Sequence, residues 1–387
     1  MIIINCSNLH KGGALQVAAS FIDNLLKLNS KDEFFILVSQ TLFDEVNFIL
    51  DISSDNRFII FENSPAHNKN ERKRILDFVI ESKCSVFFTL FGPDYLVFKN
   101  NKSYKKPYLI CGFADGWATH SVLKDYRNVY KSNYFSLVKH WLVSQLKLLF
   151  LKHKDLLIFE TNQAKVGYGS KLINKIFNNH QRLLVIPNTV RDSFRRLDVL
   201  DSSAEAFTIG ILTADYAHKN IFILLEVCRF LVSAAEWFDF RFKISISEDS
   251  ATAIKFQSSD DWEEYSKYFD FIGNIPVKEA PIFISSCNVI LQISLLETFS
   301  ATYLEAQASK KCLVAADKPF AHEICGEGAL FVDPLDSQAI GNALIELKTN
   351  KNLCEVLISK GVNNLERFPT EYERFLMYWE LITNGNN

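Results

Sequence analysis

The chain has 387 residues, which is too long for one ordinary globular core and fits two domains of about 190 residues each. Hydrophobic residues make up 48% of the chain and charged residues 22%, a composition that excludes an intrinsically disordered protein. The formal net charge of −3 and the pI near 6.3 give no overall basic excess of the kind that nucleic-acid-binding proteins carry.

The first residues, "MIIINCSNLHKGG", have neither a basic start nor a long apolar core, so we expect a strand there and no signal peptide. No stretch reaches the roughly 18–20 apolar residues that a membrane-spanning helix needs. The eight cysteines are scattered without a Cys-x-x-Cys pair, which favours buried thiols in a reducing compartment over a zinc site or disulfides. A cytoplasmic location is therefore expected.

Short apolar runs bounded by turn residues alternate with helical patterns, as expected for parallel strands that are buried on both faces. The strands predicted in the first half are Ile2–Cys6, Phe34–Ser39, Phe58–Phe61, Val86–Phe91, Tyr108–Gly112, Leu156–Glu160 and Leu183–Ile186. Those in the second half are Thr208–Thr213, Phe242–Ile246, Phe269–Ile272, Val289–Ser294, Cys312–Ala316 and Ala329–Val332. Each half is predicted to form its own α/β sandwich, with the polar stretch "TVRDSFRRLDVLDSSAEA" as the linker.

The segment 138–154, "VKHWLVSQLKLLFLKHK", mixes large apolar residues with lysines in the pattern of an amphipathic helix. One interpretation is a helix that lies on an anionic membrane surface. The other is a helix whose apolar face packs on the sheet of the first domain while its lysines are solvated. The pattern alone leaves both open.

The stretch "SLLETFSATYLEAQASKK" places Glu297 just after a predicted strand and Glu305 inside the helix that follows. Ser300 is a suitable N-cap for that helix, so backbone amides from Thr298 to Thr302 are expected to face a cleft at the carboxyl end of the strand. Such amides can hold a diphosphate, and two carboxylates can accept hydrogen bonds from hydroxyls of a sugar or ribose. Alternatively, Glu305 only stabilises the helix dipole.

The same stretch, a glutamate followed by seven residues and a second glutamate, resembles the donor-binding signature of family 4 glycosyltransferases with the GT-B fold. Other segments are similar to this family in the same order along nearly the whole chain. They are "NLHKGG" (8–13), "LLVIPN" (183–188), "IGILTADYAHKN" (209–220), "FDFIGNIP" (269–276), "GALFVDPLDSQAI" (328–340) and the terminal segment 369–382.

The resemblance implies an α/β protein with two Rossmann-like α/β/α domains that face each other across a cleft. Residues 1–192 would form an acceptor-binding domain and residues 203–367 a domain that binds a nucleotide-sugar donor. Residues 368–387 would form a helix that crosses back to the first domain. The donor is a substrate, and no cofactor is implied.

Carried over by position, the resemblance implies that Glu305 holds the donor ribose, that Glu297 contacts hydroxyls of the donor sugar, and that Lys219 pairs with the diphosphate. Lys219 would otherwise be a solvated loop lysine. The remaining positions expected to bind the donor are Gly12, Gly13, His218, Asn274, Thr298, Phe299 and Ser300. The family commonly has an arginine five residues before the lysine, where this chain has Ala214, so one diphosphate contact is missing or is supplied by another residue such as His218.

In the first half, the family often has a histidine shortly after the strand that matches "PYLIC". Here the chain reads "GFADGWATH", and Asp115, Trp117 and His120 are the candidates for that role. Asp115 is the one we assign to catalysis, although a charge in a glycine-flanked loop can also simply form a turn. Gly12 and Gly13 either let a phosphate or acceptor approach the backbone closely or only make a tight turn into the first helix.

The sequence therefore predicts a retaining, metal-independent hexosyltransferase-type glycosyltransferase of bacterial surface polysaccharide synthesis, such as O-antigen, lipopolysaccharide or capsule. No Asp-x-Asp pair is present to hold a metal on a diphosphate, and no dinucleotide or Walker fingerprint occurs. The expected partners are a nucleotide-diphosphate sugar and a glycan or lipid-linked acceptor. Peripheral contact with the anionic inner face of the cytoplasmic membrane is also expected, and no nucleic-acid partner is. The alternatives are a nucleotide-sugar epimerase on the same fold and a catalytically silent, nucleotide-binding scaffold.

Overall fold

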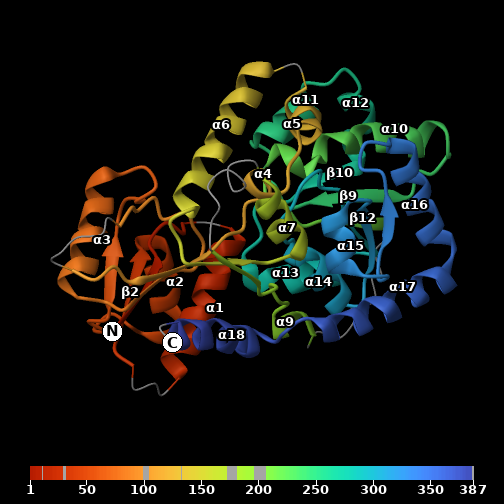
Figure 1. Cartoon of the computed structure of the whole chain (residues 1–387). Helices are drawn as coiled ribbons and strands as arrows, with labels where there is room; N and C mark the ends of the chain where they lie inside the picture. Colours follow the sequence, from red (N-terminus) through yellow and green to blue (C-terminus); the bar gives the residue numbers. More distant parts are fainter. Residues whose placement is uncertain are drawn as a thin grey trace. The chain divides into compact units, whose positions relative to one another are not determined.

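A computed structural model describes residues 1–10, 12–28, 32–98, 104–131, 133–171, 181–195 and 206–385 (Figure 1). The chain forms two compact units. Unit 1 consists of Met1–Val122, Asn133–Asn188 and Pro369–Asn387, and unit 2 consists of Leu123–Ser132 and Thr189–Phe368. Part of the predicted linker, residues 196–205, lies outside the described residues. The exact domain boundaries remain a prediction.

Unit 1 is built on a parallel sheet of seven strands in the order β3-β2-β1-β4-β5-β6-β7. Its central strands are mainly apolar because helices cover both faces, and every residue of β1 is buried. The strands are β1 (Ile2–Cys6), β2 (Phe34–Ser39), β3 (Phe58–Phe61), β4 (Val86–Thr89), β5 (Tyr108–Gly112), β6 (Leu156–Phe159) and β7 (Arg182–Val185).

The helices of unit 1 begin at residues whose side chains or conformations suit a helix start. Asn68 accepts hydrogen bonds from the amides of Asn70 and Glu71, and Thr370 and Glu373 form a capping box. The helices are α1 (Gly13–Lys27), α2 (Gln40–Leu50), α3 (Lys69–Glu81), α4 (Gly116–Thr119), α6 (Tyr134–Leu151), α7 (Asn162–Ser170) and α18 (Glu371–Asn384).

Unit 2 is built on a parallel sheet of six strands in the order β10-β9-β8-β11-β12-β13. The strands are β8 (Phe207–Ile211), β9 (Phe240–Ile244), β10 (Phe269–Phe271), β11 (Val289–Gln292), β12 (Cys312–Ala316) and β13 (Leu330–Val332). The helices are α5 (Leu123–Tyr130), α9 (Asp192–Arg195), α10 (Leu224–Ser233), α11 (Ala251–Gln257), α12 (Trp262–Tyr265), α13 (Ala280–Ser285), α14 (Ala301–Ala308), α15 (Pro319–Cys325), α16 (Ser337–Thr349) and α17 (Lys351–Asn364). Short 3₁₀ turns are η1 (Ala217–Lys219), η2 (Ile221–Ile223), η3 (Ser266–Tyr268), η4 (Val277–Glu279) and η5 (Leu365–Arg367).

The thirteen strands predicted from the sequence are all present, with ends that differ by at most two residues. The terminal helix α18 packs on unit 1, as predicted, because its apolar side joins the core of that unit. The ring of Phe375 lies 5.2 Å from that of Phe21, and Trp379 meets Phe34 at 6.3 Å. The predicted α/β fold with two Rossmann-like units and a returning C-terminal helix is therefore confirmed.

Each sheet has one point where the strand order reverses. In unit 1 it lies between β1 and β4, and in unit 2 between β8 and β11, because the connections on its two sides run in opposite directions. Loops at the carboxyl ends of two such strands diverge and leave a crevice, which is where ligands bind in open α/β sheets. The loops after β1, β4, β8 and β11 are therefore the first places to look for a site.

The predicted amphipathic segment corresponds to α6, which begins at Tyr134 and ends at Leu151, so the predicted range was wrong at both ends. Lys154 is not a solvated lysine of this helix. It is buried and its Nζ lies 2.7 Å from both carboxylate oxygens of Asp94. Among the described helices, none has the length and apolarity needed to cross a bilayer.

Candidate functional site

Lys219 and Glu297 meet at the strand-order reversal of unit 2. Lys219 ends η1 in the loop after β8, and Glu297 lies in the loop after β11. The Lys219 Nζ donates a hydrogen bond to Glu297 Oε1, and the two side chains are only 15% and 11% exposed. The hydrogen bond from the amide of Leu295 to the carbonyl of His218, at 2.7 Å, holds the two loops together. A cation and a carboxylate are thus fixed at the edge where an anionic ligand is expected.

The environment of Glu297 keeps this carboxylate ionised. Burial by itself would raise its pKa, but the charges of Lys219 and His218 and hydrogen bonds from Lys219 and Ser294 outweigh burial, so the pKa is lowered below its ordinary value. An ionised carboxylate accepts hydrogen bonds and cannot donate them. Glu297 is therefore suited to bind hydroxyl groups at neutral pH.

The N-terminus of α14 presents amides that no side chain caps. Ser300 occupies the N-cap position, as predicted, but its hydroxyl does not accept from the first turn of the helix. That hydroxyl instead accepts a hydrogen bond from Gln292 Nε2 at 3.1 Å, and Gln292 also reaches Ser294 at 3.3 Å. The predicted side-chain cap was therefore wrong, and the reason is the competing amide of Gln292. Free amide donors at a helix start favour an anion.

Glu305 lies one turn into α14 in a different electrostatic setting from Glu297. Burial raises its pKa to about 7, although Arg191 and a hydrogen bond from Thr302 act in the opposite direction. A glutamate whose role was to stabilise the helix dipole would gain from being charged. Burial of Glu305 thus works against the charged form that a role at the helix dipole would need.

The remaining residues that we predicted in unit 2 divide into two groups. His218 stacks on Tyr216 at 5.6 Å and acts electrostatically on Glu297, so it belongs with the Lys219–Glu297 pair. Thr298 is buried, and the ring of Phe299 packs against Phe368 at 5.9 Å, which is a core contact. Asn274 is exposed and follows β10, an edge strand that is separated from β8 by β9. About 10 Å thus separates the backbone at Asn274 from β8.

The glycine loop of unit 1 also ends in an uncapped helix. Gly12 is the N-cap residue of α1 with a φ of +74°, a conformation that favours glycine, and among the residues that the structure describes no side-chain hydrogen bond caps this helix. A Cβ atom at Gly12 or Gly13 would meet no described atom within 4 Å. Both glycines therefore border open space, as close approach of a ligand to the backbone requires.

Asp115 follows β5 and is held by two contacts within unit 1. One oxygen caps α4 by accepting from the amide of Ala118 at 3.2 Å, and the other lies 2.6 Å from Lys147 Nζ of α6. The ring of Trp117 contacts that of His140 of α6 at 4.7 Å in a tilted arrangement. His120 contacts the hydroxyl of Thr119 at 3.0 Å and packs against Gly167. Asp115 and Trp117 therefore form one cluster with α6 at the carboxyl end of β5.

A family model described as "Glycosyl transferases group 1" matches residues 203–363, which include Lys219, Glu297 and Glu305. Residues 203–363 of this chain therefore match the glycosyl transferases group 1 family. The resemblance inferred from the glutamate motif is therefore confirmed.

Relatives of this group 1 chain extend the comparison. The O-antigen chain mannosyltransferase RfbU of Salmonella typhimurium is 24% identical over 207 residues, which cover 53% of this chain and 51% of the relative. The match thus spans about half the length of that relative. HepE from Anabaena in complex with UDP-glucose has a TM-score of 0.70 at 14% identity, with 99% of this chain and 100% of that chain covered. A glycosyltransferase from Rickettsia africae has a TM-score of 0.69 at 14% identity, with 99% and 97% covered. The structural likeness shows the GT-B fold.

Two residues of this group 1 site were missed in the sequence. Arg191 acts on Glu305 from the segment after β7, and Gln292 orients Ser294 and Ser300 from the last position of β11. Arg191 falls in the stretch that we predicted as a linker, where a charged residue carries no distinguishing signal. Gln292 could have been found, because a polar residue inside a fully buried strand needs a hydrogen-bond partner.

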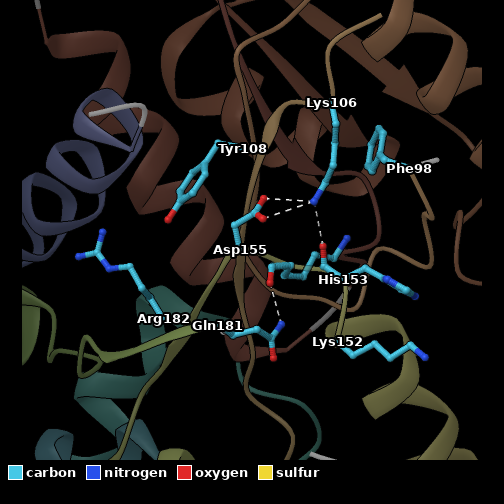
Figure 2. Close-up of a pocket in the computed structure, with 9 residues that line it drawn as sticks. Phe98, Lys106, Tyr108, Lys152, His153, Asp155, Gln181 and Arg182 are labelled. Carbon is cyan, nitrogen blue, oxygen red and sulfur yellow. Dashed lines mark hydrogen bonds and ion pairs between the residues drawn. The ribbon is translucent and has the colours of Figure 1, made fainter. Parts of the chain in front are cut away.

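A pocket of about 530 Å³ lies elsewhere in unit 1, and Figure 2 shows its lining. Tyr108, Asp155 and Arg182 lie at the amino ends of β5, β6 and β7, and Lys106 Nζ is 3.4 Å from both oxygens of Asp155. Parallel strands expose their two ends at opposite edges of a sheet. This pocket is therefore at the edge opposite the glycine loop and is not part of the candidate site of this glycosyltransferase family member.

Proposed function

We propose that this chain transfers a sugar from a nucleotide-diphosphate donor to a glycan or lipid-linked acceptor. The observation that carries the proposal is the Lys219–Glu297 pair at the strand-order reversal of the unit that matches the family. A buried cation beside an ionised carboxylate and uncapped helix amides provides partners for a diphosphate and for sugar hydroxyls at one edge. The structure of HepE with UDP-glucose indicates that this fold accepts such a donor.

Each part of the donor has a proposed partner in unit 2. The diphosphate binds Lys219 and the amides at the start of α14, with His218 beside them. The ribose hydroxyls bind Glu305, whose charge is balanced by Arg191. The hydroxyls of the sugar bind Glu297, which accepts hydrogen bonds because it is ionised.

The proposed transfer retains the configuration at the anomeric carbon. The bond from the anomeric carbon to the diphosphate oxygen breaks, and a hydroxyl oxygen of the acceptor bonds to the same face of that carbon. The departing diphosphate takes the proton of the acceptor hydroxyl, so no side chain has to act as a base. Lys219 and the helix amides stabilise the negative charge that develops on the leaving group, and fixed dipoles of this kind contribute strongly to catalysis.

The proposed acceptor side is the carboxyl edge of unit 1. The glycine loop at Gly12 and Gly13 offers open space and backbone amides, and Asp115 and Trp117 offer a carboxylate and a ring for a sugar. The O-antigen mannosyltransferase relative suggests a bacterial surface polysaccharide, O-antigen, lipopolysaccharide or capsule, as the product. We place the reaction at the cytoplasmic face of the inner membrane, where a lipid-linked acceptor is present.

A second function, a silent nucleotide-binding scaffold, is favoured by one observation. Ala214 is exposed in the loop after β8, where the family commonly has an arginine. A chain that keeps the contacts to the ribose and the sugar, but lacks one positive side chain beside the leaving group, could bind a donor without turning it over.

A ligand-induced thermal shift tests the donor site. Wild type and Glu305→Ala would be melted with UDP-, GDP-, ADP- and dTDP-sugars, because a ligand at 100 times its dissociation constant stabilises by about 2.7 kcal/mol. We expect one nucleotide class to raise the melting temperature of wild type only. If no donor shifts the melting temperature, the proposal is contradicted. A shift without turnover would favour the scaffold. Donor consumption in the absence of an acceptor would indicate an epimerase.

A further inference from the structure

Helix α6 exposes an unusual number of large apolar side chains. Seven of them are between 41% and 79% exposed: Tyr134, Phe135, Val138, Trp141, Leu142, Val143 and Leu146. Its buried residues are only Leu137, Ser144, Leu148 and Leu151. The helix therefore packs on the sheet of unit 1 through a narrow stripe that includes Leu148 and Leu151, and most of its large apolar side chains are not covered by that sheet.

The exposed apolar positions form a broad face. At 100° per residue the seven positions spread over about 200° around the helix axis. A helix that pairs with one partner helix needs a narrower seam, with apolar residues three and four positions apart. A face this wide suits immersion in a surface that has no fixed shape of its own.

The charge of α6 has one sign. Residues 134–151 contain no aspartate or glutamate, and Lys139 is exposed among the apolar residues. Lys147 pairs with Asp115, and Lys152 directly follows the helix. Aromatic residues combined with lysines and without acids are typical of helices that lie at the headgroup level of an anionic bilayer.

The exposed part of α6 lies on the functional side of unit 1. Lys147, near the end of the helix, contacts Asp115 just beyond the carboxyl end of β5. A crossover helix runs opposite to the strands it connects, so the residues before Lys147 extend beyond that edge of the sheet. Figure 1 shows α6 extending away from the strands of unit 1.

From these observations we infer that the outer face of α6 is a docking surface for an anionic lipid bilayer. The aromatic and leucine side chains enter the boundary between headgroups and acyl chains, and Lys139 attracts anionic headgroups. For the acceptor this step rests on the proposed function: a bilayer docked on α6 brings a lipid-linked acceptor to the edge that carries Asp115 and the glycine loop.

Flotation of the full-length protein with vesicles tests the inference. The vesicles consist of phosphatidylcholine alone or of phosphatidylcholine with phosphatidylglycerol. We expect wild type to float only with the anionic vesicles and to be released by salt, because screening weakens the attraction. The double variant Phe135→Ser/Leu142→Ser should bind roughly hundredfold more weakly. Lys139→Ala should lose about fivefold, the equivalent of one charge near the surface.

Phe238→Ser is the matched control, since Phe238 is an exposed phenylalanine of unit 2 at 59% exposure. This variant should float like wild type. Thermal melting of every variant checks the fold, and these exposed positions are expected to leave the melting temperature unchanged.

Three results would overturn the inference. If wild type fails to float with anionic vesicles, α6 is not a docking surface for an anionic bilayer. Flotation that survives Phe135→Ser/Leu142→Ser places the contact elsewhere. A dimer in solution that this variant converts to a monomer assigns the face to a second copy of the chain. The donor-induced thermal shift is measured in parallel without vesicles, so failure of docking and failure of the proposed function are distinguished.

Discussion

The two units share one sheet topology but use charge differently at the edge where ligands bind. In unit 2 an ionised carboxylate, a lysine and uncapped amides converge between β8 and β11. In unit 1 the corresponding loops offer two glycines beside open space, and a fully buried ion pair, Lys154–Asp94, lies in the interior with both side chains 1% exposed. The comparison teaches that an ion pair lies at the strand-order reversal in unit 2, whereas the most deeply buried described ion pair of unit 1 lies in its interior.

Removing one charge of the buried pair in unit 1 is expected to have the largest effect. Asp94 also accepts hydrogen bonds from Thr89 Oγ1 and the amide of Leu96, both at 2.9 Å, so it cannot leave its position without losing them. Lys154→Met leaves this carboxylate buried and unpaired, which should lower the free energy of unfolding by about 3–5 kcal/mol in a urea titration.

Lys27→Met is the control, because Lys27 forms an exposed pair with Asp23 at the same distance of 2.7 Å and should change stability by at most about 1 kcal/mol. Equal effects of the two variants would contradict the structural role assigned to the buried pair of unit 1.

Removing the lysine in unit 2 is expected to act on catalysis. In the proposed mechanism Lys219→Ala takes away the charge that stabilises the leaving diphosphate, so kcat/KM should fall about hundredfold to thousandfold. The control is Lys278→Ala, an exposed lysine of η4 in the same unit. Sugar transfer measured by release of the nucleotide diphosphate decides the outcome. Normal turnover by Lys219→Ala would mean that the diphosphate binds elsewhere.

The strands could be predicted because parallel strands covered on both faces are apolar along their whole length, and this signal does not depend on distant residues. The positions of Lys219 and Glu297 in the loops after β8 and β11 could be predicted because the strands before them are evident in the sequence, whereas their roles were inferred from the resemblance to the family. Residues that act through distant partners could not be predicted in this way. Arg191 reaches Glu305 from another part of the chain, and Lys154 pairs with Asp94 in the interior.

The hydroxyl of Ser300 shows a different limit. Ser300 does occupy the N-cap position of α14, as predicted. Its hydroxyl, however, accepts a hydrogen bond from Gln292 at the end of β11, and a rule that considers only the residues of the helix start cannot anticipate such a competitor. The exposure of α6 was undecided for a related reason. The same amphipathic pattern serves a helix on a sheet and a helix on a membrane, and only packing distinguishes the two.

The pKa of Glu305 predicts how donor binding depends on pH. Because that pKa is raised to about 7, Glu305 is mostly protonated at pH 6 and mostly ionised at pH 8. If the ionised form accepts the ribose hydroxyls, the donor dissociation constant should fall about tenfold from pH 6 to pH 8. Glu305→Gln should bind the donor about tenfold to hundredfold more weakly at pH 8 and show little pH dependence.

The raised pKa of Glu305 has the opposite effect on the stability of the protein without donor, which should fall as the pH rises. A folded-state pKa above the unfolded value means that the contribution of Glu305 to stability is fully present below pH 4.5 and is lost as the pH rises through about 7. Wild type should therefore lose more stability between pH 5 and pH 8 than Glu305→Gln does. Calorimetric melting at the two pH values measures this difference, and parallel curves for the two proteins would contradict burial as the cause.

Restoring the charge that the family commonly has should produce the smallest effect. Ala214 is exposed, so an arginine fits there without displacing the core, and in the proposed site Lys219 already neutralises part of the diphosphate. Ala214→Arg should therefore tighten donor binding by no more than about tenfold, the contribution of one partly solvated hydrogen bond to a charged group. Ala214→Lys places a charge at the same position without the planar fork of a guanidinium, and should gain less. Isothermal titration with the preferred donor compares the three proteins.

A gain in turnover far beyond the gain in affinity would mean that the lost arginine acts on the leaving group, and that wild type is closer to a silent scaffold than to an efficient transferase. Unchanged binding and turnover would show that unit 2 holds the diphosphate through Lys219, His218 and the amides of α14 without help from this position.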